Sequence, residues 1–325
     1  MCEPRTNKML KILQPGQDGS SQQVCTAQKM RMSAAKTIAH LDGKHPCFSS
    51  TAEGHKKAGR LHLPVSPACN IECRFCRRDF NSTEQRPGVA RQLISPEEAP
   101  DVVAHALDLC PEINVVGIAG PGDTLATDHA LRAFELVHRR FPQLIKCLST
   151  NGLLLEEKAE RIASAGVGTI TVTVNATEPE VLVQLCTGIG YGGRRVTGIE
   201  AAELLISKQL AGIRRIAELG VTVKANTVLV PGINDHHIEE VAAMVAAAGA
   251  SIINVIPLLP QHELSHLPRP DFIQISRARR DAEKHLGVFA HCNRCRADAC
   301  GIPGETDFSI ALYGRRIAAS TFSHG

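Results

Sequence analysis

The stretch that decides the fold is LHLPVSPACNIECRFC, residues 61–76. Its first six residues, LHLPVS, are typical of a strand that leads directly into a loop with three cysteines. Cys69, Cys73 and Cys76 form the pattern C-x3-C-x2-C, and no fourth cysteine stands next to them. Structural zinc sites are closed by a fourth ligand, whereas catalytic metals keep one position open, and cysteine thiolates commonly hold iron–sulfur clusters. The loop therefore predicts an open iron site that faces a substrate, with a zinc or plain electron-transfer site as the alternative.

From residue 61 onward, short apolar runs alternate with segments of helical periodicity. Repeated units of this kind predict a parallel sheet covered by helices. We count about six units, fewer than the eight of a closed barrel, and therefore predict a partial, open (β/α)6 barrel rather than a doubly wound sheet. The expected strands are 61–66, 113–119, 145–149, 168–175, 222–230 and 252–259. The expected helices are 95–109, 127–141, 155–165, 198–220 and 237–249.

Small or polar residues follow the predicted strands, in the segments PACN, AGPGD, STNG, TVNAT, LVPGIN and IPLLP. In α/β sheets the carboxyl ends of the strands form the ligand site. One such turn is ordinary, but six that share small and amide residues predict a common cleft.

Composition sets limits on function. Hydrophobic residues make up 43% of the 325 residues, which supports a large core, and the formal net charge is +3. This small charge and the 3% aromatic content argue against nucleic-acid binding. No apolar run reaches the ~18 residues of a membrane span, and the first residues are polar, so we expect no membrane partner and a cytoplasmic location. A reducing compartment disfavours disulfides, so the clustered thiols among the 12 cysteines are expected to serve as metal ligands or redox groups.

The chain divides into three parts by pattern. Residues 1–44 are rich in Gln, Ser, Lys and Gly without a sustained period, so we expect a flexible extension. Residues 45–305 hold the barrel and the cysteine motifs, and 306–325 are expected to form a C-terminal tail.

At the cysteine triplet, the chain resembles the radical S-adenosylmethionine superfamily. The resemblance implies a [4Fe–4S] cluster held by Cys69, Cys73 and Cys76, with the amine and carboxylate of S-adenosylmethionine on the fourth iron. It also implies that an electron from the cluster cleaves the sulfonium to give a 5′-deoxyadenosyl radical.

The same resemblance places cofactor groups at the other strand ends. Each of these positions has a simple capping role as its alternative. AGPGD stands where the superfamily has a turn that meets the methionine amine, and the other turns match positions near the ribose, carboxylate and adenine. The residues implied are Gly120, Gly122, Asp123, Ser149, Asn151, Thr173, Asn175, Asn226 and Val228.

Other cysteines lie outside the triplet. HCNRCRADACG carries Cys292 and Cys295 as a C-x2-C pair, which alone is typical of zinc, iron–sulfur or redox sites. Cys47 follows His45 in HPCF, and Cys147 lies near the end of a predicted strand. Isolated Cys110 and Cys186 are most simply buried apolar residues.

Together with RPGV, GIAGPGD, CLSTNG and PGIND, these motifs closely resemble the family of nitrogenase cofactor maturases, from about His45 to Glu305. The resemblance implies two auxiliary [4Fe–4S] clusters, which the family fuses with a carbide from a cofactor methyl group and a sulfur into the eight-iron precursor of the iron–molybdenum cofactor. Cys292 and Cys295 match one auxiliary cluster, and Cys47, Cys147 and His45 match positions of auxiliary ligation. The implied partners are a cluster donor, carrier or scaffold proteins of nitrogenase assembly, and an electron donor such as ferredoxin or flavodoxin.

The sequence departs from the family in one loop, since RRDFNSTEQ lacks the cysteine that many members carry before RPGV. We also expect a stand-alone form without a C-terminal carrier domain. Two alternatives remain: a radical enzyme with auxiliary clusters that modifies another substrate, and a non-catalytic iron–sulfur carrier.

Overall fold

The computed structural model describes residues 38–49 and 51–314. Most of the expected extension over 1–44 and the end of the expected tail lie outside these residues. Within them, Leu41 packs with Phe48 and Phe289 in a small apolar cluster. Residues 309–313 form α10 (Ser309–Tyr313), and the Tyr313 hydroxyl donates to the carbonyl oxygen of His62 over 2.6 Å. Both ends of the described chain therefore pack on the core.

The central sheet of the described residues has eight strands and is parallel except at one edge, where β1 pairs antiparallel with β13. Six of its strands are those expected from the sequence. The first and last strands of the sheet do not pair with each other, so the sheet stays open and the predicted partial barrel is confirmed. From edge to edge, the strands are β12 (Gly287–Val288), β11 (Ile252–Pro257), β10 (Thr222–Leu229), β7 (Val167–Thr173), β6 (Ile145–Thr150), β5 (Ile113–Ile118), β1 (Gly59–His62) and β13 (Cys300–Gly301).

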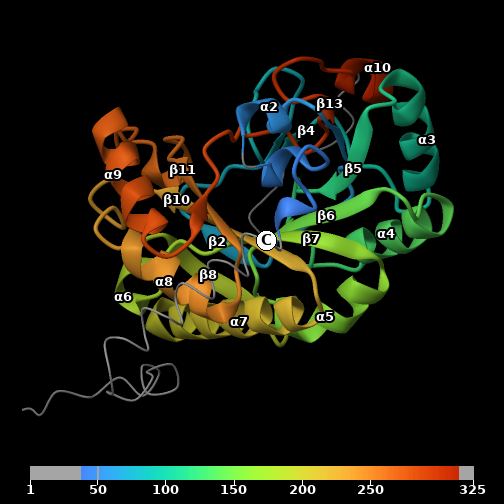
Figure 1. Ribbon diagram of the computed structural model, residues 1–325. Coiled ribbons are helices and arrows are strands. Elements are labelled where there is room, and N and C mark those ends of the chain that lie inside the picture. The colour runs from blue at the N-terminus through green and yellow to red at the C-terminus, as the bar shows by residue number, and fades with distance from the viewer. Residues whose placement is uncertain (1–37, 50, 315–325) are drawn as a thin grey trace, which may run out of the picture.

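Helices cover the outer side of this curved sheet (Figure 1). In the helix His129–Arg140, the side chains of Leu131, Phe134 and Val137 recur at helical spacing and are all fully buried, as expected for an amphipathic helix. Gly212 allows the longest helix to lie close to its neighbour, since a Cβ there would meet the Leu155 Cβ at 2.7 Å. The helices are α3 (Ala99–Leu109), α4 (His129–Arg140), α5 (Leu155–Ser164), α7 (Gly198–Glu218), α8 (Ile238–Ala248) and α9 (Phe272–Glu283).

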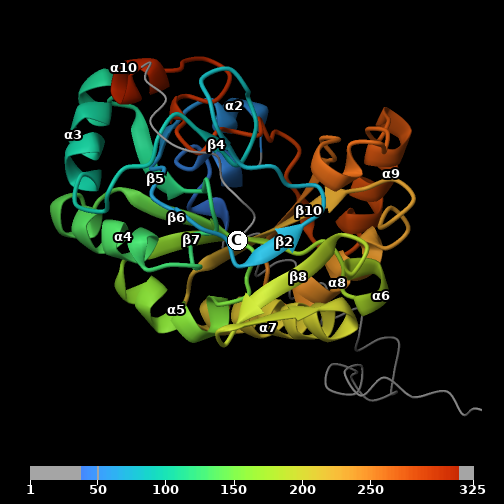
Figure 2. The same cartoon turned by 180° about the vertical axis from the view of Figure 1, so that it is seen from behind.

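The sequence did not predict a second, antiparallel sheet beside the cysteine triplet. It consists of β2 (Ile71–Cys73), β8 (Cys186–Tyr191) and β9 (Arg194–Thr197), and it lies above α7 (Figure 2). Gly192 and Gly193 form the turn of the β8–β9 hairpin with φ of 58° and 74°, which favours glycine. Cys73 pairs with Cys186 across this sheet, and both Cys186 and Cys110 are buried, as expected.

The remaining elements are short and lie mostly in the connections. They are η2 (Pro46–Phe48), α2 (Ala52–His55), β3 (Asp79–Phe80), β4 (Val89–Ala90), α6 (Pro179–Leu182) and η3 (His262–Leu264).

Segments from the two ends of the described chain meet over the open side of the barrel, where α2 lies near β13 (Figure 1). The His55 ring lies 3.3 Å from the Asn293 amide, and Lys56 forms an ion pair of 2.7 Å with Glu305. Below them, the buried carboxylate of Asp298 accepts from both Arg91 and Arg296. These contacts fix the loop that carries Cys292 and Cys295.

Candidate active site

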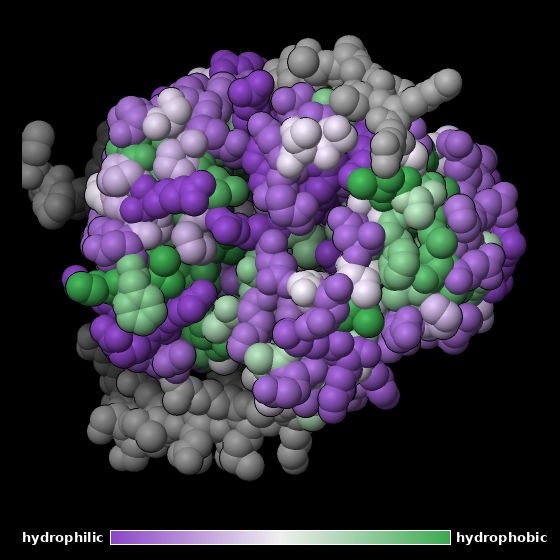
Figure 3. Space-filling view, turned by 90° about the horizontal axis from the view of Figure 1, so that it is seen from above, coloured by the Kyte–Doolittle hydropathy of each residue, from purple (hydrophilic) through white to green (hydrophobic). Residues whose placement is uncertain are grey.

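A cavity of about 330 Å³ lies inside the curved sheet. Alternate residues of the central strands face it, such as Thr171 and Thr173 on β7, because side chains on a strand alternate between its two sides. The face seen from above is mainly hydrophilic and is hollowed near its centre (Figure 3). The predicted site residues that line the cavity are His45, Cys47, Cys69, Cys73, Cys76, Gly122, Asp123, Cys147, Ser149, Asn151, Thr173, Asn226, Val228, Cys292 and Cys295.

The cysteine triplet forms one wall of the cavity. Cys73 ends β2, and the turn that follows is closed by a hydrogen bond of 3.1 Å from the Cys76 amide to the Cys73 carbonyl. Arg78 Nη2 donates to Cys69 Sγ over 2.9 Å. Burial raises the pKa of the Cys69 thiol, and the Arg78 guanidinium opposes that shift. Three free thiols and one guanidinium on a single wall fit an iron–sulfur cluster with an open iron.

The AGPGD turn fastens the cysteine loop to the neighbouring strand end. The Asp123 carboxylate is buried and accepts from the amides of Asn151 at 2.6 Å and Leu125 at 2.9 Å. It also accepts from the Thr150 hydroxyl at 3.0 Å. A Cβ on Gly122 would lie 2.1 Å from the Ala68 carbonyl oxygen, so only glycine fits there. These contacts explain Gly122 and Asp123 by loop positioning.

Two predicted residues, Gly120 and Asn175, do not line the cavity. The Asn175 side-chain oxygen accepts from the Val228 amide over 2.9 Å, which ties together the ends of β7 and β10. Asn254 on β11 was not predicted, and it does line the cavity. Its amide nitrogen donates to Asn226 over 3.2 Å, while its buried Oδ1 has no partner within the described residues. Such an oxygen fits a polar ligand beside Asn226.

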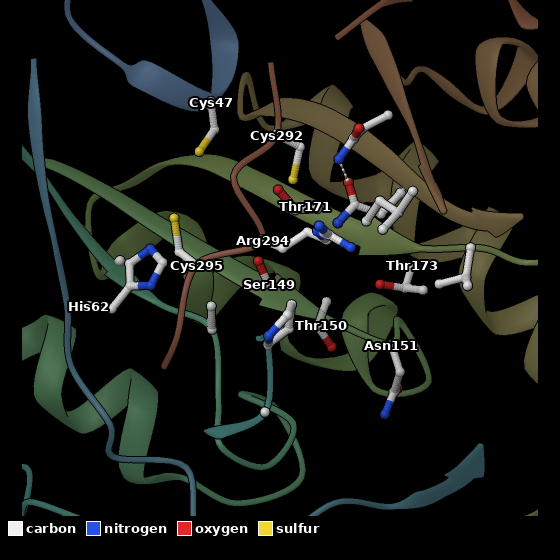
Figure 4. Close-up of a pocket in the computed structure, with 18 of the residues that line it drawn as sticks. Cys47, His62, Ser149, Thr150, Asn151, Thr171, Thr173, Cys292, Arg294 and Cys295 are labelled. Carbon is white, nitrogen blue, oxygen red and sulfur yellow. Dashed lines mark hydrogen bonds between the residues drawn. The ribbon is translucent and has the colours of Figure 1, made fainter. Parts of the chain in front are cut away.

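The cysteines outside the triplet gather on another wall of the cavity, and we call Cys47, Cys147, Cys292 and Cys295 the second cysteine set. They come from η2, β6 and the loop after β12, and Figure 4 shows Cys47, Cys292 and Cys295 around the same space. The pKa of Cys47 is raised to about 12, chiefly by burial; the Lys224 ammonium opposes this shift, and the other three thiols add to it. The fold therefore unites cysteines that lie far apart in the sequence.

Two histidines border the second cysteine set. His45 Nδ1 accepts from the Cys47 amide at 3.1 Å, so its Nε2 carries the proton and donates to Thr169 at 3.2 Å. Both His45 nitrogens are thus engaged, and its ligand role stays a prediction. His62, which the sequence did not single out, donates from Nδ1 to the Arg296 carbonyl at 2.8 Å, and it lines the same cavity as Cys295 (Figure 4). The sequence feature that could have pointed to His62 is its position at the end of the strand before the cysteine loop.

His62 Nε2 therefore keeps a free lone pair toward the cavity. Burial is the main cause that lowers the pKa of His62 to about 4, with a smaller effect from Arg60, so the ring is neutral. A neutral imidazole whose other nitrogen donates to a backbone carbonyl has the usual arrangement of a metal-binding histidine. Gly117 provides room for this ring, because a Cβ there would lie 2.9 Å from His62 Cδ2.

The fold and the cysteine triplet define a class of enzyme, and comparison with known proteins agrees. The family model described as Radical SAM superfamily matches residues 63–245, so the chain belongs to that superfamily, whose members use S-adenosylmethionine and a [4Fe–4S] cluster. A radical SAM methyltransferase from Sphaerobacter thermophilus aligns with a TM-score of 0.50 at 18% identity, over 71% of this chain and 64% of that chain. That likeness concerns the fold alone.

Closer relatives identify the branch. The FeMo cofactor biosynthesis protein NifB of Methanocaldococcus infernus is 41% identical over 278 residues, which cover 85% of this chain and 91% of the relative. The protein with the same description from Methanocaldococcus jannaschii is 42% identical over 82% of this chain and 89% of the relative. The chain therefore belongs to the NifB family of radical SAM enzymes.

Among the helices of residues 38–49 and 51–314, none has the length and apolar character of a membrane span.

Proposed function

We propose that this enzyme acts in FeMo-cofactor biosynthesis by fusing two [4Fe–4S] clusters, with a carbide derived from S-adenosylmethionine and an added sulfur, into the eight-iron precursor. One observation carries the proposal: the cysteine triplet and the second cysteine set line the same cavity. A radical formed at the triplet would then act directly on substrate clusters held at the other wall. The family membership supports the same role.

In this proposal Cys69, Cys73 and Cys76 hold the resident [4Fe–4S] cluster. That cluster and S-adenosylmethionine, when bound, supply the 5′-deoxyadenosyl radical. Asn226, Val228 and Asn254 would contact the nucleoside part of the cofactor, and Ser149, Asn151 and Thr173 would contact the remainder. Asp123 and Gly122 position the loops around the cofactor. Gly120 and Asn175 do not line the cavity and would act indirectly, through the residues that do.

The second cysteine set holds the two clusters that are consumed as substrates. Cys292 and Cys295 serve one of them, and Cys47, Cys147 and an imidazole serve the other. A cluster that must be fused and released needs few protein ligands, because full cysteine ligation would retain it. His62 is the imidazole with a free nitrogen, and His45 becomes available only if it loses a hydrogen bond.

The proposed partners are a cluster donor, a carrier or scaffold protein that receives the product, and a ferredoxin or flavodoxin as electron donor. Because the precursor is an oxygen-sensitive iron–sulfur species, we propose that it passes directly between proteins.

Anaerobic reconstitution tests the proposal against its alternatives. The maturase should bind about three clusters and should convert S-adenosylmethionine both to S-adenosylhomocysteine, as methyl donor, and to 5′-deoxyadenosine, as radical source. Deoxyadenosine without S-adenosylhomocysteine would favour a radical enzyme that modifies another substrate. No cleavage of the cofactor would favour a carrier, although a carrier has no need of the polar strand ends at Ser149 and Asn226.

A further inference from the structure

The cavity is unusually rich in positive charge. Arg60, Arg78, Lys224 and Arg294 line it, whereas Asp123 is the one carboxylate among the described residues that do so. Arg60 and Lys224 are buried, and neither takes part in an ion pair with a carboxylate of the described residues. Buried charges are normally paired, because removal from water is costly without a counter-charge.

Lys224 lies near the start of β10 and projects toward the second cysteine set. Its Nζ donates to the Cys47 carbonyl over 3.2 Å. The ammonium also lies 5.0 Å from the ring centre of Phe48 and 5.1 Å from that of Phe289. Two ring faces and one carbonyl orient the ammonium but supply no negative charge.

Arg60 lies on β1 and also lines the cavity. Its Nη1 donates to the Gly301 carbonyl over 2.6 Å, which fixes the plane of the guanidinium. Nε and Nη2 both point at Cys295 Sγ, at 3.4 and 3.3 Å. The guanidinium thus presents two donors to the sulfur of a second-set cysteine, as it would to a thiolate.

We propose that Lys224 and Arg60 are the counter-ions of the second cysteine set and hold its anionic iron–sulfur substrates in the cavity. A reduced, monocationic [4Fe–4S] core carries net negative charge once two thiolates hold it. The fused product is also anionic, because the carbide and the sulfide bring more negative charge than the two oxidised cores bring positive charge. Two buried cations can retain such a species while individual iron–ligand bonds change. Arg78 serves the cysteine triplet in the same way through Cys69. This inference rests on the proposed function.

The test uses the full chain, reconstituted anaerobically with iron and sulfide. In Lys224→Met and Arg60→Met, transfer of iron from the second set to a chelator should become about 10- to 100-fold faster, the usual effect of removing an outer-shell partner. Lys224→Arg should retain iron like the unchanged protein, because it keeps the charge. Lys146→Met is the matched control: Lys146 is buried on β6, donates to the Leu144 carbonyl at 2.8 Å and does not line the cavity.

A second measurement separates charge pairing from a structural role. Without iron, Lys224→Met should unfold at a temperature no lower than the unchanged protein, because an uncompensated buried cation has been removed. For Lys224→Met, a clearly lower unfolding temperature, or iron transfer no faster than in the unchanged protein, would overturn the inference for Lys224. For Arg60→Met, iron transfer no faster than in the unchanged protein would overturn the inference for Arg60. If the unchanged protein binds only about four irons per chain, the second set holds no cluster, and both this inference and the proposed function fail.

Discussion

His62 donates from Nδ1 to the backbone carbonyl of Arg296 over 2.8 Å, and this contact leaves Nε2 as the free nitrogen of a ring that lines the same cavity as Cys295. The neighbouring His45 has no such free nitrogen, since both of its ring nitrogens are hydrogen-bonded. The two histidines are therefore a natural matched pair for testing which imidazole binds a substrate cluster.

We expect His62→Ala to lower the iron content by up to about four per chain and to remove any nitrogen hyperfine coupling from the reduced auxiliary clusters. His45→Ala should leave that coupling in place, although loss of the Cys47 and Thr169 contacts should destabilise the fold by about 1 kcal/mol. Pulsed paramagnetic resonance of the two variants decides between them. A coupling that disappears only in His45→Ala would assign the ligand to His45.

The C-x2-C pair gives a second prediction. Because we propose that these thiols hold one substrate cluster, Cys292→Ala combined with Cys295→Ala should remove about four irons per chain, while the resonance signal of the cysteine triplet persists. Cys110→Ala is the control, because Cys110 is a buried thiol that does not line the cavity. Unchanged iron content in the double variant would refute the assignment of the pair.

Arg78 should tune the resident cluster. Its guanidinium lies 2.9 Å from Cys69 Sγ and favours the more negative, reduced form of a cluster there. We expect Arg78→Met to lower the reduction potential by about 40 mV, which corresponds to ~1 kcal/mol for one electron. The reduction potential of Arg78→Lys should lie between those of Arg78→Met and the unchanged protein. A redox titration followed by paramagnetic resonance measures the shift, and a potential equal to that of the unchanged protein would contradict this role.

The reactivity of the thiols tests the geometry of the second cysteine set without metal. Thiolates are the reactive form, so burial, which raises the pKa of Cys47 to about 12, should make this thiol slow to alkylate at pH 8. Cys292 is exposed and should react with iodoacetamide before Cys47 does, as followed by peptide mass spectrometry. Loading with iron and sulfide should protect both. Similar rates for Cys47 and Cys292 in the metal-free protein would show that the cavity is open at Cys47.

The alternation of strands and helices was sufficient to predict the barrel, because continuous apolar strands and amphipathic helices leave a clear period. The β8–β9 hairpin escaped prediction because its strand Cys186–Tyr191 is interrupted by glycines and lacks an apolar run. For the site, spacing identified the triplet, but not His62, Lys224 or Arg60. Each of these is an isolated polar residue on a strand, and only the curvature of the sheet shows that it faces the cavity.

Asp123 and Asn175 illustrate the opposite difficulty. The sequence correctly places both residues after the ends of strands. It cannot show whether a polar side chain there faces the ligand or the next strand. In the structure, Asp123 accepts from the Asn151 amide at the end of β6, and Asn175 accepts from the Val228 amide. Hydrogen-bond partners, rather than residue type, separate ligand-facing groups from those that position the loops.

Gly122 offers a test of that positioning role. A Cβ at this site would lie 2.1 Å from the Ala68 carbonyl oxygen, so Gly122→Ala must push the cysteine loop away from the turn. We expect a loss of about 1–3 kcal/mol in the free energy of unfolding and weaker binding of the resident cluster. Gly168→Ala is the control, since a Cβ there meets no atom within 4 Å. Chemical denaturation and the iron content of the two variants check this expectation, and equal stability of both would show that the loop can shift freely.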